Sequence, residues 1–156
     1  MPTRREMLAR SSKASATVLA LLAGAGLLPQ PALAAWSAAA FDAKSMAEAV
    51  KALGGSAAVE SKDVTLTGPD IAENGAVVPV GAACSLPGVK RLLLLVEKNP
   101  SALAAVFELG DAVDANLNTR VKMGQSSNVF AVAMMADGKV LFAVKEIKVT
   151  LGGCGG

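Results

Sequence analysis

Beyond Gly55, hydrophobic and polar residues alternate with the two-residue period of β-strands. Turn-forming sequences divide this region into seven runs, so we expect seven strands. The predicted ranges are Val59–Thr67, Ala76–Cys84, Val89–Glu97, Ala104–Leu109, Leu117–Met123, Asn128–Ala136 and Lys139–Thr150. Asp137-Gly138 separates the last two runs, and this dipeptide predicts an antiparallel hairpin.

Three local patterns refine this prediction. The unbroken apolar run Leu92–Val96 indicates a central strand that is covered on both faces. Pro79 cannot donate a backbone hydrogen bond, so it places the second strand at a sheet edge or at a bulge. In the last strand the apolar positions change parity between Val144 and Ile147, which predicts a β-bulge there.

A single helix is expected before the strands, over Asp42–Leu53, because its apolar residues recur at helical spacing. Asp42 can cap its start, and Gly54-Gly55 can end it. One helix followed by seven short strands predicts an all-β fold, an immunoglobulin-like β-sandwich of about seven strands with an N-terminal helix. A β-barrel is the alternative.

Residues 1–34 are interpreted as a cleaved export signal. A basic start is followed by the uncharged run Ala16–Leu28, which is too short to span a bilayer, and Ala32-Leu33-Ala34 fits a cleavage site. The opening Thr3-Arg4-Arg5-Glu6-Met7-Leu8 resembles a twin-arginine signal, and an ordinary secretion signal is the alternative. Either signal predicts a periplasmic protein.

The net charge changes when this signal is removed. The full chain has fifteen basic and thirteen acidic residues, of which four and one lie in the signal, so the mature chain carries a net charge of −1. No basic field remains to attract nucleic acid or a membrane surface, and we expect neither as a partner. The mature chain divides into residues 35–151, the helix and β-sandwich domain, and residues 152–156.

The last five residues, Gly152-Gly153-Cys154-Gly155-Gly156, place one cysteine among four glycines at the end of the chain. Glycine gives the backbone its greatest conformational freedom, and chain ends stay mobile unless they are tied down. The pattern predicts a flexible arm that presents the thiol of Cys154 for covalent attachment.

The sequence offers no group to activate this thiol. It contains no histidine, so a Cys–His pair is excluded, and two separated cysteines do not form a zinc site of the usual spacing. An ordinary thiol is only a few per cent thiolate at pH 7. We therefore expect a carrier on which other proteins act, with no catalytic residues, metal or cofactor of its own.

Cys84 ends a predicted apolar strand, and we expect it to be a buried, free core residue. The alternative is a disulfide between Cys84 and Cys154, which an oxidising compartment would permit. The sequence leaves this alternative open.

The C-terminal sequence resembles that of the SoxY family, the sulfur carriers of bacterial thiosulfate oxidation. The resemblance is carried by the terminal pentapeptide after Glu146–Leu151, by Asp70–Val80, by the Lys98-Asn99-Pro100 turn and by the Met134–Gly138 hairpin. It implies that Cys154 is the attachment site for sulfur, with Gly152, Gly153, Gly155 and Gly156 forming the swinging arm.

The resemblance also implies partners. A haem enzyme, SoxAX, would conjugate thiosulfate to Cys154, the hydrolase SoxB would release sulfate, and a sulfane dehydrogenase would oxidise the remaining sulfur. A β-sandwich subunit, SoxZ, would form a heterodimer with the carrier. Two other classes stay open: a structural exported domain that forms a disulfide through Cys154, and a thiol oxidoreductase, which would need a second reactive cysteine nearby.

Overall fold

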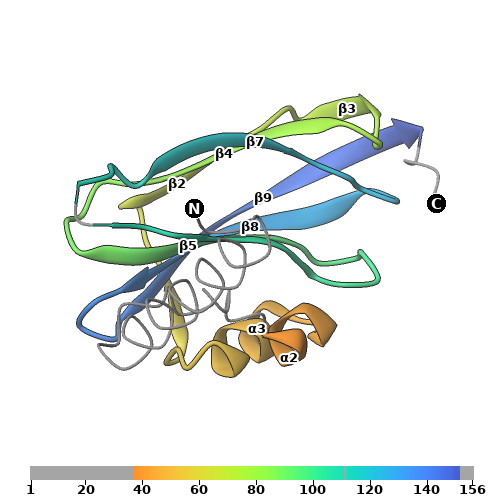
Figure 1. The fold of residues 1–156 in the computed structure, drawn as a ribbon. Helices are drawn as coiled ribbons and strands as arrows, with labels where there is room; N and C mark the ends of the chain where they lie inside the picture. Colours follow the sequence, from red (N-terminus) through yellow and green to blue (C-terminus); the bar gives the residue numbers. More distant parts are fainter. Residues whose placement is uncertain (1–36, 111, 152–156) are drawn as a thin grey trace, which may run out of the picture. The chain divides into compact units, whose positions relative to one another are not determined.

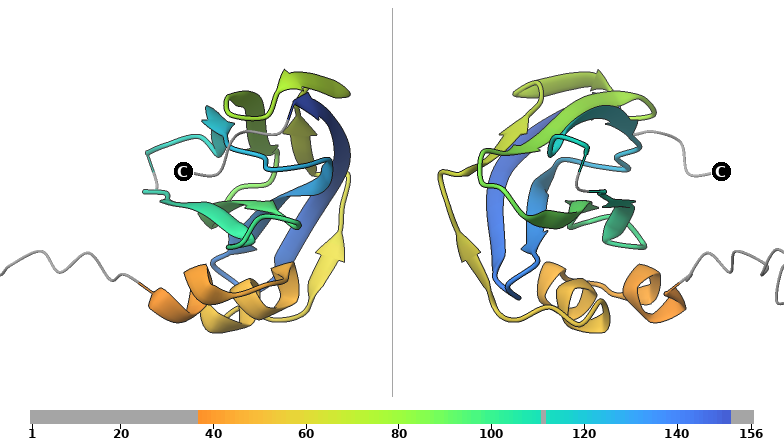
Figure 2. Two further views of the ribbon diagram at one scale, coloured as in Figure 1. Left: turned by 90° about the vertical axis from the view of Figure 1, so that its right-hand side faces the viewer. Right: turned by 60° about the vertical axis from the view of Figure 1, so that its left-hand side comes forward.

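The computed structural model describes residues 37–110 and 112–151, which form a sandwich of two β-sheets with helices on one outer face (Figures 1 and 2). The larger sheet has six strands in the order β1-β9-β8-β5-β6, with β3 also paired to β9, and the smaller has the order β2-β4-β7. The elements are α2 (Ala38–Asp42), α3 (Met46–Ala52), β1 (Ala58–Glu60), β2 (Val64–Thr67), β3 (Ile71–Asn74), β4 (Val78–Cys84), β5 (Val89–Val96), β6 (Leu103–Glu108), β7 (Asn116–Val121), β8 (Ser127–Met135) and β9 (Val140–Leu151).

This architecture confirms the predicted all-β, immunoglobulin-like sandwich, and the two separate sheets exclude a barrel. The predicted export signal, residues 1–34, and the predicted arm, residues 152–156, lie outside the described residues. None of the helices in the described ranges is long and apolar enough to span a bilayer.

The predicted helix over residues 42–53 is two helices instead of one. Ser45, not Asp42, caps the longer helix, α3, because the Ser45 hydroxyl accepts a hydrogen bond from the Glu48 amide at 3.3 Å. The Glu48 carboxylate in turn accepts from the Lys44 amide at 2.9 Å, which stabilises the break between the helices. The predicted stop is confirmed, since Gly54 adopts a φ of +79° just after α3.

Strand β5 is an interior strand of the larger sheet, paired with β8 and β6, and it is covered on both faces as its apolar run predicts. Leu92, Leu94 and Val96 pack between the two sheets, whereas Leu93 and Leu95 pack under the helices. All five side chains are buried. The strand is therefore covered on both faces, which accounts for the absence of polar alternation.

The bulge predicted in the last strand is wrong. The pairing of β8 with β9 runs from Ser127–Ile147 to Met134–Val140 without a shift in register. Val140, Phe142 and Val144 lie on the face of β9 that is turned to the helices. The helices cover the first two but not Val144, which is 39% exposed. Ile147 lies on the opposite face and packs between the sheets. The apolar residues change from one face of β9 to the other because the helices no longer cover the strand beyond Phe142. The strand itself is regular.

Pro79 does not lie on an edge strand, because β4 is the middle strand of the smaller sheet. Its neighbour β2 pairs only with residues 81–84, while Pro79 faces Arg120 of β7 on the other side. β2 ends before it would lie opposite Pro79. Proline has no amide hydrogen to donate, but no hydrogen bond to β2 is lost at this position.

The first predicted strand is divided between the two sheets. β1 pairs in parallel with the start of β9, a turn at Ser61 and Asp63 follows, and β2 joins the smaller sheet. The chain then returns to the larger sheet as β3, a strand that the sequence pattern did not predict, which pairs in parallel with the end of β9. The described residues thus form nine strands instead of seven.

Candidate functional site

The predicted site residues, Cys154 and its four flanking glycines, lie outside the described residues. They follow directly on Leu151, the last residue of β9. The described part of the site is therefore the end of β9 and the groups that hold it in place.

The end of β9 is bound on both edges. On one edge β3 pairs with it in parallel, with Asn74 opposite Leu151, and the Thr150 hydroxyl donates to the Glu73 carbonyl at 3.0 Å. On the other edge the main-chain pairing with β8 ends at Ser127, and the Ser126 hydroxyl then accepts a hydrogen bond from the Val149 amide at 2.9 Å. These bonds fix the backbone up to the residue from which the arm begins.

Three connections surround this strand end, namely residues 74–77, 97–100 and 122–126, and we call them the collar. The Met123 amide donates to the Gly75 carbonyl at 2.7 Å. The Asn99 side chain donates to the Lys122 carbonyl at 2.7 Å and accepts from the Gly124 amide at 3.3 Å. Each connection of the collar is thereby hydrogen-bonded to another, although they are far apart in the sequence.

An ion pair fixes the chain that leads into β3. The Lys145 ammonium lies 2.8 Å from an Asp70 carboxylate oxygen and donates to the Gly68 carbonyl at 2.6 Å. The hydrogen bond from Lys145, together with its charge, holds the pKa of Asp70 below its ordinary value of 3.8. Because Lys145 is on β9, this pair ties the entry to β3 to the same strand that carries the arm.

The exposed side chains of the collar include one apolar residue, Val77, two cations, Lys98 and Lys122, and one carboxylate, Glu97. Val77 is 54% exposed, and Lys98 and Lys122 are exposed as well. Within residues 37–110 and 112–151, neither lysine forms an ion pair with an acidic side chain. Glu97, the acidic residue next to Lys98, accepts a hydrogen bond from the Asn128 side chain at 3.0 Å.

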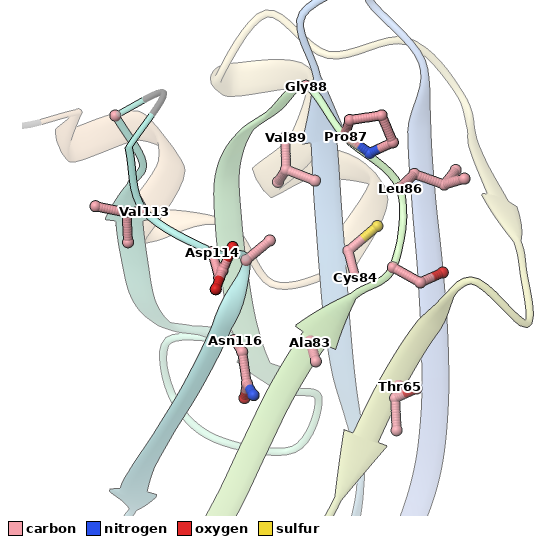
Figure 3. Close-up of a pocket in the computed structure, with 13 residues that line it drawn as sticks. Thr65, Ala83, Cys84, Leu86, Pro87, Gly88, Val89, Val113, Asp114 and Asn116 are labelled. Atoms are coloured by element: carbon pink, nitrogen blue, oxygen red, sulfur yellow. The ribbon is translucent and has the colours of Figure 1, made fainter.

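Cys84 is a free thiol, but it is only partly buried, so the prediction of a buried core residue needs correction. It is the last residue of β4 and lines a cavity of about 650 Å³ with Leu86, Pro87, Val89 and other residues. Figure 3 shows its sulfur atom pointing out of the end of β4 towards the loop that holds Leu86 and Pro87. The thiol lies at the open end of the sheet, because the paired strand β2 begins level with Cys84, and residues 85–88, 110 and 113–116 line the cavity beyond it.

Cys84 and the end of β9 lie at opposite ends of the sandwich. Val89, which shares the cavity with Cys84, pairs with Met135 beside the β8–β9 hairpin, where β9 begins. From Val140 to Leu151 the strand extends about 36 Å at ~3.3 Å per residue. Residues 152–154 can extend only about 11 Å from Leu151. Cys154 therefore cannot reach Cys84 of the same folded molecule, which removes the intramolecular disulfide.

A metal site is not found among residues 37–110 and 112–151. In these ranges no group of three or more cysteine, aspartate or glutamate side chains is placed to hold a metal ion, and the sequence has no histidine. What the geometry provides is an end of β9 that is bound on both edges, directly before the residues of the predicted arm.

Comparison with known proteins identifies the family. The family model described as "Sulfur oxidation protein SoxY" matches residues 49–154, well over half of the chain. The protein belongs to the SoxY family. The match includes position 154, so the family pattern extends through the terminal cysteine. As a SoxY-family member the protein is a sulfur carrier of sulfur oxidation and not a catalyst, as the sequence predicted.

Solved structures agree with this assignment. The sulfur carrier protein SoxY from Chlorobium limicola f thiosulfatophilum is similar at 32% sequence identity, with a TM-score of 0.59 over 65% of this chain and 92% of that chain. The superoxide reductase (neelaredoxin) from Ignicoccus hospitalis is similar at 15% identity, with a TM-score of 0.50 over 55% of this chain and 79% of that chain. This second likeness concerns the fold alone. No curated protein matches the sequence.

Sequence reasoning pointed to Cys154, which lies outside the described residues, but missed the residues that hold the end of β9. Ser126 and Asn99 carried no signal for this role, because each acts on a residue 23 positions away in the chain. The Lys98-Asn99-Pro100 sequence was interpretable only as a turn.

Proposed function

We propose that the protein carries thiosulfate-derived sulfur as a covalent adduct on Cys154 and presents it to separate enzymes in the periplasm. The observation that carries this proposal is the SoxY family match, which runs through position 154. It is supported by the anchored end of β9, which leaves two glycines between the fixed backbone and the thiol.

The chemistry needs enzymes that the chain itself does not supply. Joining the thiol to thiosulfate gives Cys154–S–S–SO₃⁻ and releases one proton and two electrons, which a haem enzyme of the SoxAX type would accept. Hydrolysis of the terminal sulfur–sulfur bond with one water gives Cys154–S–SH, sulfate and a proton, the reaction of a SoxB-type hydrolase. A sulfane dehydrogenase would then oxidise the remaining sulfur.

The short arm suits visits to several enzymes. Residues 152–154 can carry the thiol about 11 Å from Leu151, and glycine adds no side chain that would obstruct a narrow channel. A partner subunit of the SoxZ type would complete the carrier as a heterodimer. Export by the twin-arginine route, with cleavage after Ala34, would bring the carrier to these partners in the periplasm.

Intact mass spectrometry of the protein from thiosulfate-grown cells tests the proposal. The mature chain should begin at Ala35 and carry sulfur and sulfonate additions. Cys154→Ser should remove every addition, whereas the matched variant Cys84→Ser should remove none. Additions that persist in Cys154→Ser would refute the proposal.

The same spectrum tests the alternative of a structural domain that uses Cys154 for an intermolecular disulfide. That alternative predicts a dimer that reductant converts to an unmodified monomer, with no sulfur additions under any growth condition.

A further inference from the structure

We propose that Asn74 is a site of spontaneous deamidation, at which water converts the side-chain amide to aspartate or isoaspartate. The reaction forms a cyclic imide within the chain and then hydrolyses it, so it needs neither an enzyme nor a cofactor. It changes the strand that holds the end of β9. The inference does not depend on the proposed function, since it concerns only the Asn74 side chain and the amide of the next residue.

Asn74 differs from the other asparagines in the residue that follows it. The sequence has five asparagines, and Asn74 is the one that precedes a glycine, whereas positions 99, 116, 118 and 128 precede proline, leucine, threonine and valine. In imide formation the main-chain nitrogen of the next residue attacks the side-chain carbonyl carbon. A side chain on that residue obstructs the approach, and proline has no amide hydrogen to lose. Gly75 therefore offers the least obstructed nitrogen.

The turn after β3 brings the two reacting groups together. The Asn74 side-chain oxygen, Oδ1, accepts a hydrogen bond from the Ala76 amide at 2.9 Å. The ring that this bond closes contains the main-chain nitrogen of Gly75, so the side-chain carbon Cγ of Asn74 is held near that nitrogen. The same bond stabilises the negative charge that develops on Oδ1 during the attack.

The Gly75 amide is available for this attack. Among residues 37–110 and 112–151, no residue accepts a hydrogen bond from it. The turn keeps its shape through a different group, because the Gly75 carbonyl accepts a hydrogen bond from the Met123 amide at 2.7 Å. Asn74 itself is exposed, so water can reach the imide and hydrolyse it.

The steps balance without an oxidant or a reductant. The Gly75 nitrogen loses its proton and bonds to Cγ of Asn74, and the bond from Cγ to the side-chain nitrogen breaks and releases ammonia. Water then opens the imide. Attack at Cγ gives aspartate, and attack at the main-chain carbonyl carbon of residue 74 gives isoaspartate, in which the chain runs through Cγ. Each product is about 1 Da heavier than the amide and carries one more negative charge at neutral pH.

The two products differ in their effect on β9. Asn74 is opposite Leu151 in the pairing of β3 with β9, and the Thr150 hydroxyl donates to the Glu73 carbonyl at 3.0 Å. Aspartate leaves the main chain unchanged. Isoaspartate adds one carbon to the main chain at this point, which displaces residue 74 from its pairing position. Isoaspartate should therefore loosen the end of β9, whereas aspartate should not.

Asp137-Gly138 provides an internal control. The Asp137 side-chain oxygen Oδ1 accepts a hydrogen bond from the Lys139 amide at 3.0 Å, so this turn contains the same kind of ring as the turn at Asn74. The side chain is a carboxylate, however, and an ionised carboxylate resists attack by a nucleophile. The side-chain hydrogen bond from Lys139 holds the pKa of Asp137 below its ordinary value of 3.8. Asp137 should therefore not form the imide at neutral pH.

Peptide mapping by mass spectrometry tests the proposal. The folded mature carrier is incubated at pH 8, samples are digested at intervals, and the aspartate and isoaspartate peptides are separated by chromatography. We expect position 74 to react about tenfold faster or more than each of the other asparagines, with no isoaspartate at position 137.

A glycine substitution tests the attacking group. The φ of Gly75 is not positive, so its backbone accepts alanine. Gly75→Ala should slow the reaction at position 74 about tenfold or more, because the added methyl group obstructs the attack. Gly124→Ala, a change to another glycine of the collar, should leave the rate unchanged.

Three results overturn the proposal. Position 74 reacting no faster than the other asparagines refutes the assignment. An unchanged rate in folded Gly75→Ala refutes the role of the Gly75 nitrogen. Reaction at position 74 only after unfolding in urea shows that the folded turn prevents the attack. The wild-type measurements decide the proposal even if Gly75→Ala does not fold.

A second measurement tests the effect on β9. The Lys148 amide donates to the Asp70 carbonyl at 3.0 Å, so the Thr150 amide, two residues further on, faces the same edge of the strand. The purified isoaspartate form should exchange the Thr150 amide about five times faster or more than Asn74→Asp, which has the same charge without the extra carbon. Equal exchange in the two proteins would show that isoaspartate leaves the pairing of β3 with β9 intact.

Discussion

The Val149 amide donates a hydrogen bond to the Ser126 hydroxyl at 2.9 Å, at a point where main-chain pairing between β8 and β9 has already ended. A side chain thus continues the edge of the sheet towards the root of the arm. Together with β3 on the opposite edge, it holds the last residues of β9 in the sheet. The end of β9 therefore depends on a bond made by a serine outside β8.

Replacing this serine should loosen the end of β9. Ser126→Ala removes the acceptor of the Val149 amide, and a hydrogen bond of this kind contributes about 1 kcal/mol. We expect the Val149 amide to exchange with solvent about five times faster or more, with little change in global stability. Hydrogen exchange followed by NMR measures this directly.

Ser56→Ala provides the control for this exchange experiment. The Ser56 hydroxyl donates to the Gly138 carbonyl at 2.9 Å, at the other end of β9, so its loss should leave Val149 unaffected. Unchanged exchange of Val149 in Ser126→Ala would show that β3 alone holds the end of the strand.

The ion pair between Asp70 and Lys145 should make stability depend on pH. Because the folded-state pKa of Asp70 lies below 3.8, its ordinary value, the carboxylate stabilises the fold at pH values above 3.8. This contribution is lost as the pH falls through the lowered pKa. Urea unfolding should show wild type more stable than Asp70→Asn at pH 6, with the two converging in strong acid.

A second pair of variants tests whether Lys145 is the group that makes the Asp70 carboxylate stabilising. In a Lys145→Met background the Asp70→Asn change should have no further effect at pH 6, because the ammonium that lowers the pKa is gone. If Asp70→Asn is equally destabilising with and without Lys145, the carboxylate acts through some other group.

Local signals in the sequence predict the central strands well. Leu92–Val96 identified a strand covered on both faces, and Asp137-Gly138 identified the hairpin between β8 and β9, because each depends on residues adjacent in the chain. β3 was missed because it has only four residues, between Pro69 and Gly75, which are too few to establish a period. The apolar pattern changes face near Val144 because the helices do not extend over this part of β9. No local sequence pattern contains that information.

In the candidate site, too, local features could be predicted from the sequence and contacts between distant segments could not. Cys154 is distinctive in the sequence because four glycines and the chain end surround it. The base of the arm depends on contacts between distant segments, such as the Asn99 side chain with Lys122 and Gly124. Such contacts exist only once the sandwich has formed, so the sequence could suggest a candidate residue, Cys154, but not the contacts that hold the end of β9.

The hairpin glycine should be sensitive to substitution. Gly138 adopts a φ of +87°, where an L-residue with a side chain is strained. Gly138→Ala should lower the free energy of unfolding by about 1 kcal/mol. Gly124→Ala is the control, because its backbone is not in this region and an added Cβ meets no atom within 4 Å. Equal urea midpoints for the two variants would contradict the prediction.

The separation of Cys84 from the arm makes a last prediction about oxidation. Leu151 lies about 36 Å along β9 from the end of the sandwich that holds Cys84, and residues 152–154 span only about 11 Å. Treatment of the folded carrier with diamide should therefore give dimers linked through Cys154, and no monomer lighter by two hydrogens. Non-reducing intact mass measures both species. Cys84→Ser should leave the dimers unchanged and Cys154→Ser should abolish them, whereas an oxidised monomer that either substitution removes would mean that β9 can detach far enough for the two cysteines of one molecule to meet.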